Sequence, residues 1–157
     1  MTVEYTGNRI HSKGPYTHEE YVGGEAGIYP GMLLELQSDD TVDIHSDENG
    51  RAEAIFAEED ALQGKAIGDV YTAANIVSCI LPMVGCEIRA LIQDGQDISI
   101  GERLVSAGDG TLKSLGTLDS EAIDVFVIAI AMETCDASDS RSPTIGAFCR
   151  VRITAGN

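Results

Sequence analysis

Tryptophan is absent from this 157-residue sequence, and aromatic residues together make up only 5% of it. So few rings offer no evident stacking platform for bases or sugars. Positive charge is scarce as well, because 10 Lys and Arg residues stand against 26 Asp and Glu, a formal net charge of −16. Nucleic acids and anionic membranes are bound through basic surfaces, so the composition argues against both as partners.

Long apolar segments are also missing. The longest strongly apolar run, residues 125–132, is far shorter than the roughly 20 residues that cross a bilayer. The N-terminal residues contain no apolar stretch of the kind that a secretion signal needs, so we expect a protein without a signal peptide or a membrane span. Hydrophobic residues make up 43% of the chain, which is sufficient for one domain with a core of its own.

The cysteine pattern contains no Cys-x-x-Cys pair, and no histidine lies at ligand spacing from a cysteine. A zinc site is therefore not supported. All four cysteines lie inside or beside apolar segments: Cys79, Cys86, Cys135 and Cys149. We expect them to be buried free thiols rather than disulfides.

The N-terminal segment differs in charge from the rest of the chain. Residues 1–18 carry Arg9 and Lys13 against Glu4, whereas the remaining 139 residues carry 8 basic and 25 acidic residues. The segment also lacks helical or strand periodicity. We interpret residues 1–22 as an extended N-terminal arm and residues 23–157 as a β-rich domain; a frayed terminus is the alternative.

From residue 23 onward, short apolar runs alternate with turn signals such as Pro30-Gly31 and Gly108-Asp109-Gly110. An Asn-Gly pair in residues 47–50 predicts a hairpin that joins strands at 42–44 and 52–56. Acidic residues followed by a glycine predict one short helix at 58–64. The pattern indicates an all-β fold with one or two short helices, a small β-barrel or β-sandwich-like domain. Further strands are predicted at residues 32–36, 75–81, 87–93, 98–100, 103–107, 111–115, 124–134 and 147–154. The last of these alternates cleanly, which predicts an inward face of Ala147, Cys149, Val151 and Ile153 and an outward face of Phe148, Arg150 and Arg152.

No motif in the sequence carries a recognisable chemistry. An EF-hand register that begins at His45 has no acid at its first position and Phe56 instead of Glu at its last. A nucleophile elbow, Gly-x-Ser-x-Gly, does not occur. We therefore expect no enzymatic activity, no cofactor and no metal. A small hydrolase or isomerase that uses His45 with nearby acids, and a β-barrel that binds a small ligand, are the alternatives.

A series of short motifs runs in order along most of the chain. They are EAGIYPGMLLE at 25–35, FAEEDALQGKAI at 56–67, DVY at 69–71, IV at 76–77, GERL at 101–104, DGTL at 109–112, AIAME at 129–133 and VRI at 151–153. In their order and spacing these motifs resemble the lambda-like head decoration proteins of tailed bacteriophages, which cement the capsid.

The resemblance implies a structural virion protein, made in the host cytoplasm, that binds the major capsid protein on the outer surface of the capsid where subunits meet. It also implies a homo-oligomer, with a trimer favoured, in which residues 23–157 form the decoration domain. Another β-structured virion component, such as a head fibre or a tail-associated module, is the nearest alternative. The capsid contacts expected in the arm are Tyr5, Arg9, Ile10, Lys13, Tyr16 and Tyr21.

Overall fold

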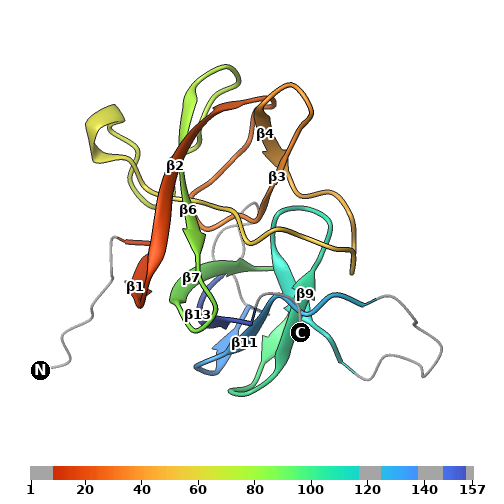
Figure 1. The fold of residues 1–157 in the computed structure, drawn as a ribbon. Coiled ribbons are helices and arrows are strands. Elements are labelled where there is room, and N and C mark those ends of the chain that lie inside the picture. The colour runs from red at the N-terminus through yellow and green to blue at the C-terminus, as the bar shows by residue number, and fades with distance from the viewer. Residues whose placement is uncertain (1–8, 117–124, 138–146, 155–157) are drawn as a thin grey trace, which may run out of the picture.

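Strands dominate the computed structural model, which describes residues 9–116, 125–137 and 147–154, and they form an upper and a lower group in Figure 1. The upper group is a five-stranded sheet. Its order is β3 (Leu34–Leu36), β4 (Thr41–Ile44), β2 (Tyr16–Gly23), β6 (Ile76–Pro82) and β5 (Phe56–Ala57). A bridge between Leu33 and Phe56 joins the two ends of this order, so the sheet closes into a small barrel.

The lower group is a six-stranded sheet. Its order is β1 (His11–Lys13), β7 (Glu87–Ile92), β10 (Leu112–Ser114), β9 (Arg103–Ser106), β11 (Ala129–Ala131) and β13 (Ala147–Ile153). Strand β13 also pairs with β7 over six residue pairs, so this sheet closes on itself as well. We call the two closed sheets the upper barrel and the lower barrel. A separate two-stranded sheet is formed by β8 (Asp97–Ile98) and β12 (Cys135–Asp136).

Strands shared between two hydrophobic cores hold the groups together. Alternate residues of a strand point to opposite faces. In β7, Ile92 belongs to the core of the lower sheet and Leu91 to the core of the upper sheet. Where β5 pairs with β6, Phe56 and Ile80 pack into the lower core, whereas Cys79 packs into the upper one. Over these parts of β5, β6 and β7, both faces pack against protein.

The predicted turn at Pro30-Gly31 connects the two cores. Gly31 has a φ of 94°, a left-handed conformation that favours glycine. A Cβ at this position would lie 2.7 Å from Cε1 of Phe148. The carbonyl of Gly31 accepts a hydrogen bond of 3.0 Å from the amide of Leu91, so glycine permits the close approach of the turn to β7.

The all-β prediction is confirmed, and so are several of its local parts. Strands β9 and β10 pair as an antiparallel hairpin around the glycine-rich turn at 108–110. In β13 the predicted alternation is observed, with Cys149, Val151 and Ile153 fully buried and Arg152 exposed.

The predicted hairpin at residues 47–50 is wrong. Strand β4 pairs with β3 and β2, whereas β5 pairs with β6. The segment at Leu33 and Leu34 lies between the two predicted strands, because the Leu33 carbonyl accepts from the amide of His45 at 3.1 Å and the Leu34 amide donates to the carbonyl of Ile55 at 2.8 Å. Residues 47–55 therefore form a loop, to which buried His45 is bonded through the Arg51 carbonyl, 3.0 Å from Nε2; its Nδ1 lies 2.8 Å from the Ser106 hydroxyl of β9.

The predicted helix at 58–64 is a single 3-10 turn, η1 (Ala61–Gln63). The Asp60 carboxylate caps it by accepting from the amides of Leu62 and Gln63, and Gly64 ends it with a φ of 68°. The predicted strand at 124–134 is shorter than expected, because only Ala129–Ala131 is a strand and residue 124 lies outside the described residues. No helix in the described ranges is long and apolar enough to cross a membrane.

The expectation of four free thiols is wrong for one pair. Cys135 in β12 and Cys149 in β13 form a disulfide, with Cα atoms 5.9 Å apart. The bond links the small β8–β12 sheet to the lower barrel. Cys79 and Cys86 are free and buried, as expected, and burial together with the charge of Glu58 raises the pKa of Cys79 to about 12.

We predict that the double substitution Cys135→Ser with Cys149→Ser lowers the free energy of unfolding by about 3 kcal/mol, the entropic effect of opening a loop of this length. Urea unfolding with and without a reductant measures it. The reductant should destabilise the parent protein by a similar amount and leave the double variant unchanged. Identical unfolding midpoints of the parent in both conditions would contradict a stabilising disulfide.

Candidate functional site

The described part of the predicted arm, residues 9–22, is built into both sheets. Strand β1 pairs with β7, and strand β2 pairs with β6 over seven residue pairs. The predicted boundary between residues 22 and 23 falls inside β2. These residues are hydrogen-bonded parts of the two barrels.

Ile10 requires a correction, because its side chain belongs to the core and not to the surface. It is fully buried in the lower core. Its amide donates to the Glu59 carboxylate at 2.8 Å, and its carbonyl accepts from the amide of Arg89 at 2.8 Å. An apolar side chain with both backbone groups paired stabilises the fold and is not available as a capsid contact.

The other predicted contacts are arranged in different ways. Arg9, Lys13 and Tyr16 are exposed, and the Tyr16 ring lies against His11 with centroids 4.3 Å apart. Tyr21 is partly buried and packs against the upper core. Tyr5 lies outside the described residues. A capsid contact by these five tyrosine and basic side chains stays a prediction.

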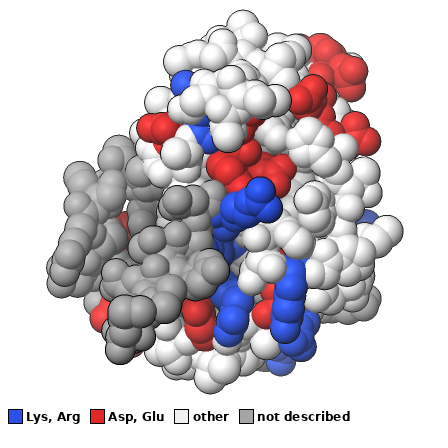
Figure 2. Space-filling view, turned by 90° about the vertical axis from the view of Figure 1, so that its left-hand side faces the viewer, with Lys and Arg blue, Asp and Glu red and all other residues white. Residues whose placement is uncertain are grey.

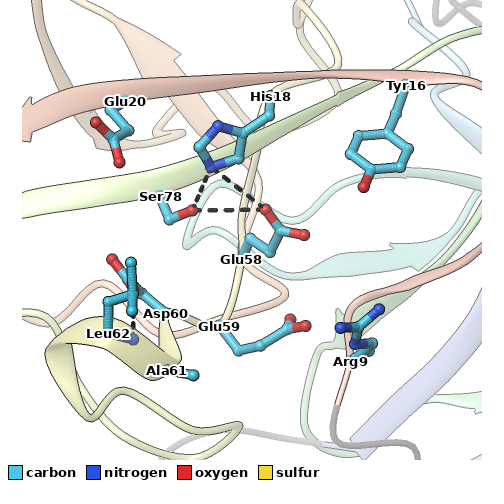
Figure 3. A pocket seen from close by; sticks show the side chains of 10 residues that line it. All are labelled: Arg9, Tyr16, His18, Glu20, Glu58, Glu59, Asp60, Ala61, Leu62 and Ser78. Carbon is cyan, nitrogen blue, oxygen red and sulfur yellow. Dashed lines mark hydrogen bonds and ion pairs between the residues drawn. The ribbon is translucent and has the colours of Figure 1, made fainter.

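A polar pocket of about 380 Å³ lies between β2, β6 and η1 (Figure 3). Acidic side chains predominate in its lining, which contains Arg9, Tyr16, His18, Glu20, Glu58, Glu59, Asp60, Ala61, Leu62 and Ser78. Two of the predicted contact residues, Arg9 and Tyr16, thus lie at its edge in Figure 3.

The centre of this pocket holds a histidine, a serine and a glutamate. His18 Nε2 lies 2.8 Å from Ser78 Oγ and 3.8 Å from Glu58 Oε2 (Figure 3). In a serine-hydrolase relay the acid binds the other ring nitrogen, so this arrangement does not match that mechanism. Burial and the neighbouring charge of Glu59 raise the pKa of Glu58, against the opposing effect of His18.

A second cluster surrounds the buried carboxylate of Glu87, whose side chain is 2% exposed. Lys13 Nζ lies 3.0 Å and Arg152 Nη2 3.5 Å from Glu87 Oε2, and Arg150 Nε lies 3.7 Å from Oε1. Burial alone would raise the pKa of Glu87, but hydrogen bonds and charges from Lys13 and Arg152 outweigh it and lower the pKa. The carboxylate thereby fixes three cations on one face of the lower barrel.

Two acidic side chains between residues 39 and 48 have partners within the structure. Asp39 accepts hydrogen bonds from the amide and hydroxyl of Thr41, and Glu48 forms an ion pair with Lys113. The pKa of Asp43 is raised by burial and by its acidic neighbours, first among them Glu25. These acids serve as turn residues and surface charges.

Sequence reasoning missed both clusters because each combines distant segments. The pocket joins β2, β6 and the residues around η1, and the Glu87 cluster joins β1, β7 and β13. One signal was visible, namely the outward positions of Arg150 and Arg152 in the alternating last strand. The pairing of that strand with Glu87 follows only from the sheet order.

The sequence matches no protein-family model and no curated protein sequence. Among solved structures, a similar fold occurs in the N base of the head fibre gp8.5 in bacteriophage phi29. The two share 17% sequence identity and align with a TM-score of 0.54 over 91% of this chain and 98% of the other. At this identity the similarity establishes a shared fold over nearly the whole length of both chains.

We predict that Ile10→Ala lowers the free energy of unfolding by about 2–5 kcal/mol, because it removes buried methyl groups from the lower core. Ile10→Val, which removes a single methyl group, should cost about 0.5–1.5 kcal/mol. Chemical denaturation measures both. Equal stability of the parent and the alanine variant would show that residue 10 is dispensable for the fold.

Glu87 should make stability depend on pH. Because its folded pKa is lowered, its stabilising effect is present above the ordinary value of 4.5 and is lost as the pH falls through the folded pKa. We predict that Glu87→Gln costs about 1–3 kcal/mol at pH 7 and flattens the fall in stability below pH 4.5. Urea titrations from pH 7 to about 3 measure this, with exposed Glu19→Gln as the control. Parallel pH profiles for the parent and Glu87→Gln would contradict the prediction.

Proposed function

We propose that this chain is a non-enzymatic structural component of a tailed-phage head that attaches to the outer surface of the capsid and binds the major capsid protein. The observation that carries the proposal is the fold shared with the N base of a phage head fibre over 91% of this chain and 98% of that one. The ordered motifs that resemble head decoration proteins support the same class from the sequence.

Between the two kinds of head protein, the structural similarity favours the base of a head fibre, because nearly the entire chain corresponds to such a base. The motif series favours a decoration protein that cements the capsid. For either one, we propose a surface attachment that is made in the host cytoplasm and that functions as a homo-oligomer, with a trimer favoured. They differ in whether binding stabilises the shell.

The described geometry gives less support to the other functions considered. Buried apolar side chains fill both barrels, so neither interior favours a site for a small ligand. His45, the histidine of the hydrolase alternative, is 2% exposed and has hydrogen-bond partners at both ring nitrogens. These features suit a scaffold that presents its outer surface to a partner.

We predict that the full-length protein co-sediments with mature capsids of the phage that encodes it, prepared from a mutant lacking this protein. Native mass measurement should give three times 16.6 kDa for the free protein. A cementing protein would raise the temperature at which the capsids release DNA, whereas a fibre base would bind without changing it. Absence from the capsid fraction at saturating concentration would overturn the proposal.

A truncation that begins at residue 9 tests the contribution of Tyr5, since it leaves β1 and β2 whole. A deletion of residues 1–20 would be a poor test, because it removes β1 and most of β2 and would disrupt both barrels. Circular dichroism of the truncated chain should match the parent before capsid binding is compared.

A further inference from the structure

One face of the lower barrel is basic although the chain as a whole is strongly acidic. Four of the ten basic residues, Lys13, Arg89, Arg150 and Arg152, lie on the outer side of β1, β7 and β13. We call this set the basic face. Figure 2 shows Lys and Arg side chains gathered in the lower half of the view, on the side of the molecule to which β1 belongs.

The sheet register creates this face. In the pairing of β7 with β13, Arg150 stands opposite Arg89 and Arg152 opposite Glu87. Because side chains alternate along a strand, one side of the sheet carries Glu87, Arg89, Arg150 and Arg152. Strand β1 adds Lys13, which stands opposite Glu87 in the strand register and forms an ion pair with its carboxylate.

The upper barrel covers only one end of this side. Leu91 belongs to the upper core, and Phe148, its partner across the strands, packs against it. Toward Glu87 the surface is open, and the side chains of Lys13, Arg150 and Arg152 are 69%, 43% and 46% exposed. The open end therefore presents cations whose remaining donors can reach a partner.

The charges on the basic face are not balanced by its own residues. Among the described residues, Glu87 and Glu133, whose carboxylate accepts from the Arg150 amide at 2.8 Å, supply two negative charges against four positive ones. Arg89 and Arg150 also stand directly opposite each other, a destabilising pairing of like charges. A partner that supplies carboxylates would neutralise this excess. The Glu87 cluster itself demonstrates that the cations can converge on a carboxylate within 3.0–3.7 Å.

We propose that the basic face is the surface through which this protein docks on a carboxylate-rich surface of the capsid, an inference that rests on the proposed function. Protein carboxylates fit better than the phosphates of a nucleic acid. A polyanion would be repelled by the remainder of a chain with a net charge of −16, whereas a local acidic patch interacts mainly with the residues that it touches. Guanidinium groups also bind carboxylates in a bidentate manner.

The test uses the double variant Arg89→Gln with Arg150→Gln. It removes two charges from the basic face but leaves Lys13 and Arg152, the closer partners of Glu87, in place. The matched control is Arg51→Gln with Arg103→Gln, which removes two exposed charges from the loop after β4 and from β9. Unfolding midpoints of both variants establish that they are folded.

Binding to the capsids described above should weaken about tenfold for Arg89→Gln with Arg150→Gln at about 0.15 M salt, the loss expected for two partly exposed ion pairs. The control should bind within about twofold of the parent, since its charges lie elsewhere. Restoring positive charge with Arg89→Lys and Arg150→Lys should recover much of the binding. The affinity of the parent should also fall as salt is raised.

Equal capsid binding by the parent and the Arg89→Gln, Arg150→Gln variant would overturn this inference and leave the proposed function standing. A parent that does not bind capsids would overturn both. A smaller native mass of the variant would assign the face to contacts between copies of the chain. Binding of double-stranded DNA that the variant loses would assign it to phosphate. Either of these last results would overturn docking on capsid carboxylates.

Discussion

The backbone pairing of β7 is the constraint on which the rest of the structure depends. Both faces of this strand meet hydrophobic cores over part of its length, so its amide and carbonyl groups need protein partners on both edges. One edge is filled by β13. On the other edge, alternate amides donate to three separate segments: Arg89 to Ile10, Leu91 to Gly31 and Gln93 to Leu112. The N-terminal segment, the upper barrel and the β9–β10 hairpin are thus joined along one strand.

This arrangement explains why the N-terminal residues have a structural and a surface role at once. The backbone of residues 10–13 completes the edge of β7, and the side chain of Ile10 fills the lower core. Lys13, three positions later, points outward to Glu87. Since neighbouring side chains of an extended segment alternate between faces, a strand can seal a barrel and still supply side chains to a partner.

The sequence predicts the features that depend on adjacent residues. The turn at Pro30-Gly31, the hairpin around residues 108–110 and the alternation of β13 follow from local turn chemistry and period-two patterning. Strand pairing depends on distant residues and was not predictable in this way. The predicted hairpin at 47–50 does not form because the segment at Leu33 and Leu34 bonds to both of its expected strands. The disulfide joins cysteines from different sheets, and Ile10 packs into a core that only the folded chain creates.

The acidic composition and the basic face act over different distances. At about 0.15 M salt the screening length is about 8 Å, so a surface in contact experiences mainly the side chains beside it, whereas a long polyanion also meets the acidic side chains that lie farther along its length. Glu87 determines which side chains a contacting surface meets. A buried carboxylate is costly unless cations pair with it, and the pairing holds Lys13, Arg150 and Arg152 on one side of the sheet. A chain with a net charge of −16 can therefore repel nucleic acid and still attach to an acidic protein surface, because its fold gathers four of its ten cations at one place.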